Sequence, residues 1–195
     1  MIRSLSNEET KDIYNTYLVE DFPKSEVKPL AKILDGIADG KYETLVYEEE
    51  GNIKSYAFFI KSSVSNTYLL DYFAVIKKNR SEGIGSKFLK GLQKMVRERG
   101  GHLILEVENP EYEPPGNHRD YMFKRIEFYK KNGMCLSGVS CRFYGNEYRI
   151  FYGKDNESDC DIDDETIQAE TLLIYNDFFG EEFIERHCEF HTYYN

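Results

Sequence analysis

One segment constrains the fold of this chain more than any other, the run of residues 68–99. Its first part, residues 67–76, is almost continuously apolar, which is typical of a central strand covered on both faces. A basic loop containing Gly83 and Gly85 follows, and a helical pattern then continues to Arg99. The order of strand, glycine loop and helix directs the unpaired N–H groups of a helix N-terminus at a ligand, and such groups favour anions. The segment therefore predicts a site for a phosphate-bearing cofactor.

The charge of this segment differs from that of the chain as a whole. Residues 76–99 contain eight basic and two acidic residues, whereas the formal net charge of the protein is -10. A basic stretch in an acidic protein supports anion binding at the loop. The overall negative charge argues against nucleic acid as a partner and weakly favours cationic substrates.

Length and cysteine usage restrict the class of protein. A chain of 195 residues suits one domain, or one domain with a small extension. No apolar run approaches the roughly 20 residues of a membrane span, and the first residues lack the pattern of a signal peptide. We therefore expect a soluble cytoplasmic protein without a membrane partner. The four cysteines show no CxxC pair and no spacing typical of metal ligands, so we expect reduced thiols and no metal site.

Hydrophobic periodicity predicts a mixed α/β fold with a C-terminal helical extension. A capping-box pattern at Ser6 and Glu9 predicts the start of the first helix. The helices are expected at residues 6–19, 25–37, 83–99 and 119–131, and the strands at 42–47, 53–61, 67–76, 102–108, 134–144 and 148–152. Residues 109–117 are expected to form a Pro-rich loop. We assign residues 1–153 to one domain and 154–195 to an acidic, partly helical extension. The extension is expected to pack on its own domain, with a substrate lid or a homodimer contact as alternatives.

Three phosphate-binding patterns compete for the glycine loop. A P-loop requires a lysine directly after its last glycine, and a dinucleotide fingerprint requires a third glycine where Phe88 stands, so both fail. The pattern [RQ]-x-x-G-x-[GA] is matched completely by residues 80–85. This loop resembles the pyrophosphate loop of the GNAT superfamily of N-acetyltransferases. A second run, residues 125–134 with Phe128, Tyr129 and Gly133, resembles the FYxxxGF segment near the end of many GNAT domains.

The resemblance implies a fold and a cofactor. The fold is a mixed, mostly antiparallel central sheet of about six to seven strands flanked by helices, and its order of elements fits residues 1–153. The co-substrate is acetyl-CoA, and no metal is needed. Backbone groups of Phe73 and Val75 would bind pantetheine, while backbone N–H groups of the loop would hold the pyrophosphate beside the charge of Arg80. The implied cofactor-binding residues are Phe73, Val75, Arg80, Ser81, Glu82, Gly83, Ile84, Gly85 and Ser86.

The reaction of the family is direct attack of an amine on the thioester, which needs a general base and a general acid. The motif match implies that Tyr129 is the acid. A tyrosine with its ordinary pKa near 10 is protonated at neutral pH and can donate a proton. For the base the sequence offers Glu106, Glu108 and Asp71, and we rank Glu106 first. A carboxylate on a central strand is costly unless it is paired or used. A water chain, or a structural role for these carboxylates, is the alternative.

The predicted function is transfer of an acetyl group to a primary amine of a small molecule or a peptide. The alternative is a non-catalytic acyl-CoA-binding or interaction module with the same fold. Two departures from the family pattern motivate that alternative, since Met122 and Arg125 stand where the family often carries Asn and Ala. The acidic extension is a further reason to keep it, because residues 153–195 contain thirteen acidic and two basic residues.

Overall fold

The computed structural model describes residues 1–153 and 162–192. The chain forms two compact units, the first made of Met1–Lys61 and Leu70–Met95, the second of Ser62–Leu69 and Val96–Asn195. The boundary between the two units passes through one strand and one helix. The described chain is mixed α/β with eight strands and mostly antiparallel pairing, which confirms the predicted class. Two of the strands, β1 near the N-terminus and β8 near the C-terminus, lie outside the six predicted strand ranges.

The first unit contains the N-terminal elements and the segment that begins with the predicted phosphate loop. Its strands follow the order β1-β2-β3-β4, and Ile2 pairs with Tyr47 and Tyr42 with Ile60 in antiparallel register. The elements are β1 (Ile2–Ser4), α1 (Asn7–Ile13), the π-helical turn η1 (Tyr14–Leu18), α2 (Val19–Asp21), α3 (Leu30–Ala38), β2 (Tyr42–Glu49), β3 (Asn52–Lys61), β4 (Thr67–Val75), the 3-10 turn η2 (Lys77–Asn79) and α4 (Ile84–Glu98).

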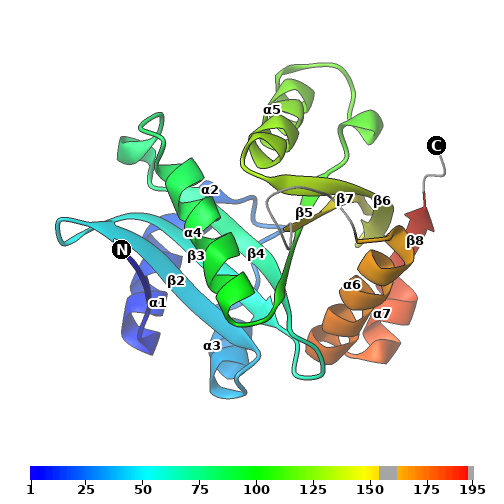
Figure 1. Cartoon of the computed structure of the whole chain (residues 1–195), viewed down its shortest axis with the longest axis horizontal. Helices are drawn as coiled ribbons and strands as arrows, with labels where there is room; N and C mark the ends of the chain where they lie inside the picture. Colours follow the sequence, from blue (N-terminus) through cyan, green and yellow to red (C-terminus); the bar gives the residue numbers. More distant parts are fainter. Residues whose placement is uncertain (154–161, 193–195) are drawn as a thin grey trace. The chain divides into compact units, whose positions relative to one another are not determined.

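Helices cover both faces of the strands in the first unit (Figure 1). On one face Phe88 of α4 is fully buried, stacks on Phe73 of β4 at 5.6 Å between ring centroids and lies 5.9 Å from the ring of Tyr47. On the other face the hydroxyls of Thr10 in α1 and Thr44 in β2 share a buried hydrogen bond of 2.7 Å. The apolar character of β4 therefore has the predicted cause, because side chains on both of its faces are covered.

The helix starts follow local sequence signals. Ser6 accepts a hydrogen bond from the Glu9 backbone N–H while the Glu9 carboxylate accepts one from the Ser6 N–H, which confirms the capping box. The next helix begins at Leu30 and not near residue 25 as expected. Pro29 stands at its N-cap, and a proline disfavours helical backbone in the residue before it. The polar stretch before Pro29 therefore stays a loop.

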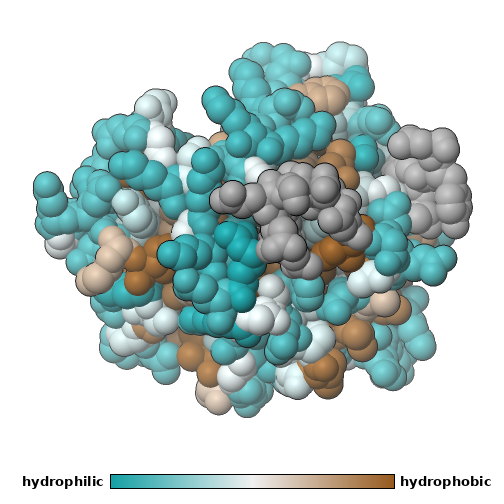
Figure 2. Space-filling view, in the orientation of Figure 1, coloured by the Kyte–Doolittle hydropathy of each residue, from teal (hydrophilic) through white to brown (hydrophobic). Residues whose placement is uncertain are grey.

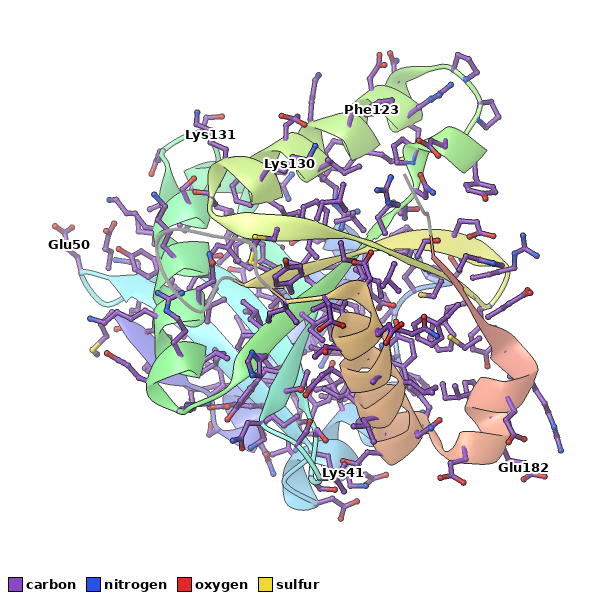
Figure 3. All side chains as sticks on the ribbon, turned by 45° about the vertical axis from the view of Figure 1, so that its right-hand side comes forward. Lys41, Glu50, Phe123, Lys130, Lys131 and Glu182 are labelled. Carbon is purple, nitrogen blue, oxygen red and sulfur yellow. The ribbon has the colours of Figure 1, made fainter. Side chains whose placement is uncertain are left out.

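The second unit contains the elements after α4. Its strands follow the order β5-β7-β6-β8, and each neighbouring pair is antiparallel. Helix α5 lies on one face of these strands, and α6 and α7 lie on the other, as the views in Figure 1 and Figure 3 agree. The elements are β5 (His102–Glu108), the 3-10 turn η3 (Pro110–Tyr112), α5 (Asn117–Lys131), β6 (Met134–Phe143), β7 (Asn146–Gly153), α6 (Asp164–Phe179), α7 (Glu181–His187) and β8 (Cys188–Thr192).

The described part of the extension packs on the second unit. The Tyr175 ring of α6 is fully buried and stacks on Phe143 of β6 at 5.4 Å, and β8 pairs with β6 in the register Phe143 with Cys188. Figure 2 shows hydrophobic side chains over α6 on the visible face, and Leu173 is one of the exposed large hydrophobic residues. The helical part of the predicted extension consists of α6 and α7.

Three findings concern the general character of the protein. Cys135 is disulfide-bonded, while Cys141 and Cys188 carry free thiols, so the expectation of reduced thiols is wrong for Cys135. Spacing along the chain carries no information about cysteines that meet only after folding. Within residues 1–153 and 162–192, no group of three potential ligands is placed to hold a metal ion. None of the helices in these ranges is long and apolar enough to cross a membrane.

Candidate active site

The predicted phosphate loop connects η2 to the first turn of α4. Ser81 has φ 69° and Gly83 has φ 75°, so two nearby residues adopt left-handed backbone. A Cβ atom at Gly83 would meet no atom within 4 Å, so the site selects glycine for its dihedral angles and not for space. Ser81 adopts a conformation that is uncommon outside glycine, and such residues cluster at functional sites.

The loop presents a run of unpaired backbone donors. Arg80 N–H donates to the Lys77 carbonyl at 3.4 Å, and the next backbone N–H to find an acceptor is that of Lys87, which bonds the Gly83 carbonyl at 3.1 Å. Among the described residues, no acceptor faces the six N–H groups of residues 81–86. They stand at the N-terminus of a 15-residue helix, where the helix dipole favours an anion. The predicted loop thus has the donors that a pyrophosphate requires.

The Arg80 side chain connects the loop to α2 and to the end of β4. Its Nη2 contacts Asp21 Oδ1 of α2 at 2.8 Å, and its Nε donates to the carbonyl of Val75 at the end of β4 at 3.0 Å. The guanidinium is half exposed, so it keeps donors directed to solvent while Asp21 compensates part of its charge. Asp21 was missed by sequence reasoning, because nothing in the local pattern links it to a residue 59 positions away.

Phe73 and Val75, the two predicted pantetheine positions, lie at the C-terminal end of β4. The Phe73 ring is occupied by its stacking on Phe88, and the Val75 carbonyl accepts the bond from Arg80. Between them, the Ala74 carbonyl accepts a hydrogen bond of 2.7 Å from the Ser55 hydroxyl of β3. This part of β4 is therefore held in place by β3, α4 and the loop.

Asp71, also on β4, is the centre of a polar network. Its carboxylate contacts the Lys28 ammonium at 2.6 Å and accepts a hydrogen bond from the Tyr42 hydroxyl. The Tyr72 hydroxyl accepts from the Lys28 backbone N–H at 2.8 Å and donates to the Glu26 carbonyl at 2.7 Å. Burial, reinforced by the Asp71 charge, holds the pKa of Tyr42 well above its ordinary value. Asp71 thus has two partners and anchors the loop before α3, which favours a structural role for it.

Tyr129 lies in the second unit, on the face of α5 that meets the strands. Its side chain is 6% exposed, and its ring lies 5.8 Å from that of Phe151 in β7. Burial raises the pKa of Tyr129, whereas the charge and hydrogen bond of Arg125, one helical turn earlier, lower it. The net direction is upward, so the hydroxyl is protonated at neutral pH and able to donate.

Glu106, the other predicted catalytic residue, is a half-buried side chain on β5. The Cys141 thiol of β6 lies 3.7 Å from its Oε1 and the same distance from the Tyr175 hydroxyl of α6. A hydrogen bond with Cys188, burial and the charge of Glu106 together raise the pKa of Cys141 well above its ordinary value. The thiol is therefore protonated and donates to the carboxylate. The sequence did not predict that Cys141 of β6 contacts Glu106. It also did not predict that Tyr175 of α6 and Cys188 of β8 contact Cys141.

The strand register shows how Glu106 and Tyr129 are related within the second unit. Leu105 pairs with Phe151, and Glu106 pairs with Ile150. Because Tyr129 packs on Phe151, α5 covers the face that carries Leu105, and Glu106 points to the opposite face. Glu108 is the last residue of β5, and its Oε2 contacts Arg125 Nη1 of α5 at 3.3 Å.

Comparisons with known proteins agree with this geometry in fold. A GNAT-family protein from Bacteroides thetaiotaomicron has 17% sequence identity and a TM-score of 0.69, with 92% of this chain and 98% of that chain covered. The aminoglycoside 6'-N-acetyltransferase from Enterococcus faecium has 17% identity and a TM-score of 0.58, with coverage of 82% and 99%. The ribosomal-protein-alanine N-acetyltransferase from Brucella melitensis has 20% identity and a TM-score of 0.55, with coverage of 78% and 98%.

Sequence comparison gives the family directly. None of the functionally curated proteins matches the chain in sequence. The model of the acetyltransferase (GNAT) family matches residues 7–134, which is well over half of the chain and includes the loop, β5 and Tyr129. On this match, with the fold in agreement, the chain belongs to the GNAT family of acetyltransferases.

Proposed function

We propose that this protein transfers the acetyl group of acetyl-CoA to a primary amine of a small molecule or a peptide. One observation carries the proposal above all, the run of unpaired N–H groups at residues 81–86 before α4. Two of the similar structures are named for amine acceptors of these two kinds, an aminoglycoside and the alanine of a ribosomal protein. The acceptor of this chain is proposed at the level of a primary amine.

The loop and β4 are proposed to bind the cofactor. The pyrophosphate accepts hydrogen bonds from the backbone N–H groups of residues 81–86, and the positive end of α4 adds to the attraction. Pantetheine binds backbone groups of Phe73 and Val75. Arg80 contributes charge and, through its contacts with Asp21 and the Val75 carbonyl, keeps the loop and the strand in one arrangement. No metal takes part in this scheme.

Catalysis is proposed to use one residue as base and one as acid. Glu106 accepts a proton from the acceptor ammonium, directly or through water. The amine nitrogen then forms a bond to the thioester carbon and loses its second proton to water, and the carbon–sulfur bond breaks with its electron pair on sulfur. Tyr129 donates its hydroxyl proton to the thiolate, and the amide and CoA leave. The buried hydroxyl of Tyr129 and the half-buried carboxylate of Glu106 support these roles.

The function predicts release of CoA thiol with an amine panel. Spermidine, an aminoglycoside and a peptide with N-terminal alanine should be incubated with acetyl-CoA, and thiol release and product mass should be followed together. At least one amine is expected to gain a single acetyl group in step with thiol release. The non-catalytic alternative predicts binding of acetyl-CoA with thiol release no faster than in the absence of amine, and that result would contradict the proposed activity.

Replacement of Glu106 by glutamine is expected to lower kcat by about 10²–10⁴-fold, the usual contribution of a general base. The KM for acetyl-CoA should stay nearly unchanged, because the side chain is assigned to the acceptor. Glu111→Gln serves as the control, since Glu111 is an exposed carboxylate just after β5. Equal kcat values for Glu106→Gln and the unchanged protein would remove Glu106 as the base.

Compartment and assembly stay predictions. The net charge of -10 argues against nucleic acid as the main partner. A cytoplasmic location and a homodimer are proposed on the sequence alone, as is the division into a domain of residues 1–153 and an extension. Sedimentation of the protein with and without residues 162–195 tests whether the extension contributes a dimer contact.

A further inference from the structure

We propose that the outer edge of β8 is a dimer interface, at which β8 of a second copy of this chain pairs as an antiparallel strand about a two-fold axis. The axis passes through Phe190, so that Glu189 of each copy faces His191 of the other. The proposal goes beyond acetyl transfer. It also assigns residues to a homodimer contact that the sequence places only somewhere in the extension.

The strand β8 is the last strand on its side of the second unit, and its neighbour is β6 (Figure 1). Backbone N–H and C=O groups alternate between the two sides of a strand, so about half of those in β8 are directed away from β6. Within residues 1–153 and 162–192, no strand pairs with that outer side. An edge of this kind is a template to which one more strand can be added.

The strand lacks the features with which proteins usually block such pairing. Those features include proline, lysine and a β-bulge on the edge strand. The sequence of β8 contains neither proline nor lysine, and its pairing with β6 runs without a register shift from Cys188 to Thr192. Its five residues are an ordinary strand length. The strand is therefore regular enough to accept a partner over its whole length.

The polar side chains of β8 are complementary to themselves in an antiparallel arrangement. A two-fold axis through Phe190 places Glu189 opposite His191 of the second copy and repeats the same pair on the other side of the axis. The Glu189 side chain is 66% exposed, and its contact with Arg142 is long at 3.9 Å, so its carboxylate can accept a hydrogen bond from an imidazole N–H. An axis through Glu189 would instead oppose two carboxylates. The charged pair therefore selects the axis at Phe190.

The other face of β8 gains an apolar contact from the same register. Successive side chains of a strand point to opposite faces, so Phe190 lies on the face opposite to Glu189 and His191. Its ring is 6.0 Å from that of the fully buried Tyr175, yet the Phe190 side chain is only partly buried. Across the proposed axis the two Phe190 side chains are cross-strand neighbours, and aromatic pairs of this kind stabilise a sheet. A second copy supplies both contacts by symmetry, which favours it over an unrelated strand.

A charge exchange tests the interface in the full-length chain. Sedimentation velocity between about 1 and 100 µM is expected to show a dimer with a roughly micromolar dissociation constant, because one strand pair buries less area than an obligate interface. Glu189→Lys and His191→Glu, each alone, are expected to raise this constant about 10-fold or more, since each opposes groups of like character. The double variant restores opposite charges and should return the constant to within about threefold. A chain that stays monomeric, single variants without effect, or a double variant as weak as the single ones would overturn the proposal.

A matched control separates the position of the charge from its presence. Glu111 is exposed and lies just after β5, which is separated from β8 by β7 and β6. Glu111→Lys changes the net charge by the same amount as Glu189→Lys, and it is expected to leave the dissociation constant unchanged. A loss as large as that of Glu189→Lys would show that net charge is responsible, which would overturn the assignment to β8.

Hydrogen exchange of the unchanged protein locates the interface without any substitution. The backbone amides of β8 are expected to exchange more slowly at about 100 µM than at about 1 µM protein, because the added strand protects them only in the dimer. A dimer in which the exchange of β8 does not depend on concentration would place the interface elsewhere and overturn the proposal. Neither measurement uses acetyl-CoA or an amine, so its outcome is independent of the proposed activity.

Discussion

Tyr129→Phe is expected to lower kcat for acetyl transfer by about 10²–10⁴-fold, because it removes the proton donor to the leaving thiolate. The affinity for acetyl-CoA should change less than about threefold, since the ring that packs against Phe151 is retained. Arg125, one turn earlier on α5, keeps its contact with Glu108 at 3.3 Å. Thiol release gives kcat, and calorimetry of the same preparation gives the dissociation constant.

Tyr121→Phe provides the control for this substitution. Tyr121 is on α5 as well, is 59% exposed and loses the same hydroxyl group when replaced. Its kcat is expected to equal that of the unchanged protein. Turnover of Tyr129→Phe at the level of Tyr121→Phe would exclude Tyr129 as the acid, and the leaving thiolate would then take its proton from water.

Gly83→Val is expected to weaken acetyl-CoA binding by about 10–100-fold while the protein stays folded. A β-branched residue is strained at φ 75°, so the loop should relax to other dihedral angles. The unpaired N–H groups of residues 81–86 then no longer converge on one anion. No steric clash contributes, because a Cβ at Gly83 meets nothing within 4 Å. Calorimetric titration with acetyl-CoA measures the effect.

The chain contains a closely matched control glycine. Gly51 lies in the turn between β2 and β3, has φ 71°, and its added Cβ would also meet nothing within 4 Å. Gly51→Val should therefore cost a similar free energy of unfolding, roughly 1–2 kcal/mol, without loss of acetyl-CoA affinity. Equal affinity losses in the two variants would mean that the Gly83 effect is only a loss of stability.

Local signals in the sequence account for the parts of the fold that were predicted well. The apolar run of β4 and the helical period of α4 lie on either side of a glycine loop, and each feature can be seen within a few residues. Ser6 and Glu9 are three residues apart, so their capping box is visible in the sequence alone. The six-residue loop pattern and the segment around Tyr129 indicated the family because each motif is short and continuous.

Features that depend on distant residues were not visible. The ion pair of Arg80 with Asp21 spans 59 positions, and that of Lys28 with Asp71 spans 43. Both change the interpretation of the site, since Arg80 braces the loop and Asp71 is committed to Lys28. The strand β8 has five residues, and too short an alternation of apolar and polar side chains to be told from a loop. Cys141 was seen only as one of four cysteines, although its thiol donates to Glu106.

The described part of the extension packs next to the proposed base. Tyr175 of α6 is fully buried against Phe143, and the thiol of Cys141 lies between the Tyr175 hydroxyl and the Glu106 carboxylate. The extension thus supplies part of the environment of the proposed base. Its acidic surface is also consistent with a cationic acceptor, because a negative field raises the local concentration of amines.

The measurement that tests the central claim most directly is a calorimetric titration of the unchanged protein with acetyl-CoA and with S-acetyl-pantetheine. The two ligands share the thioester and the pantetheine arm, and only acetyl-CoA carries the pyrophosphate that the N–H groups of residues 81–86 are proposed to bind. The account predicts saturable binding of one acetyl-CoA per chain and an affinity for S-acetyl-pantetheine that is lower by about 100-fold or more, since several charge-assisted hydrogen bonds are lost. No binding of acetyl-CoA at millimolar concentration, or equal affinity for the two ligands, would contradict it.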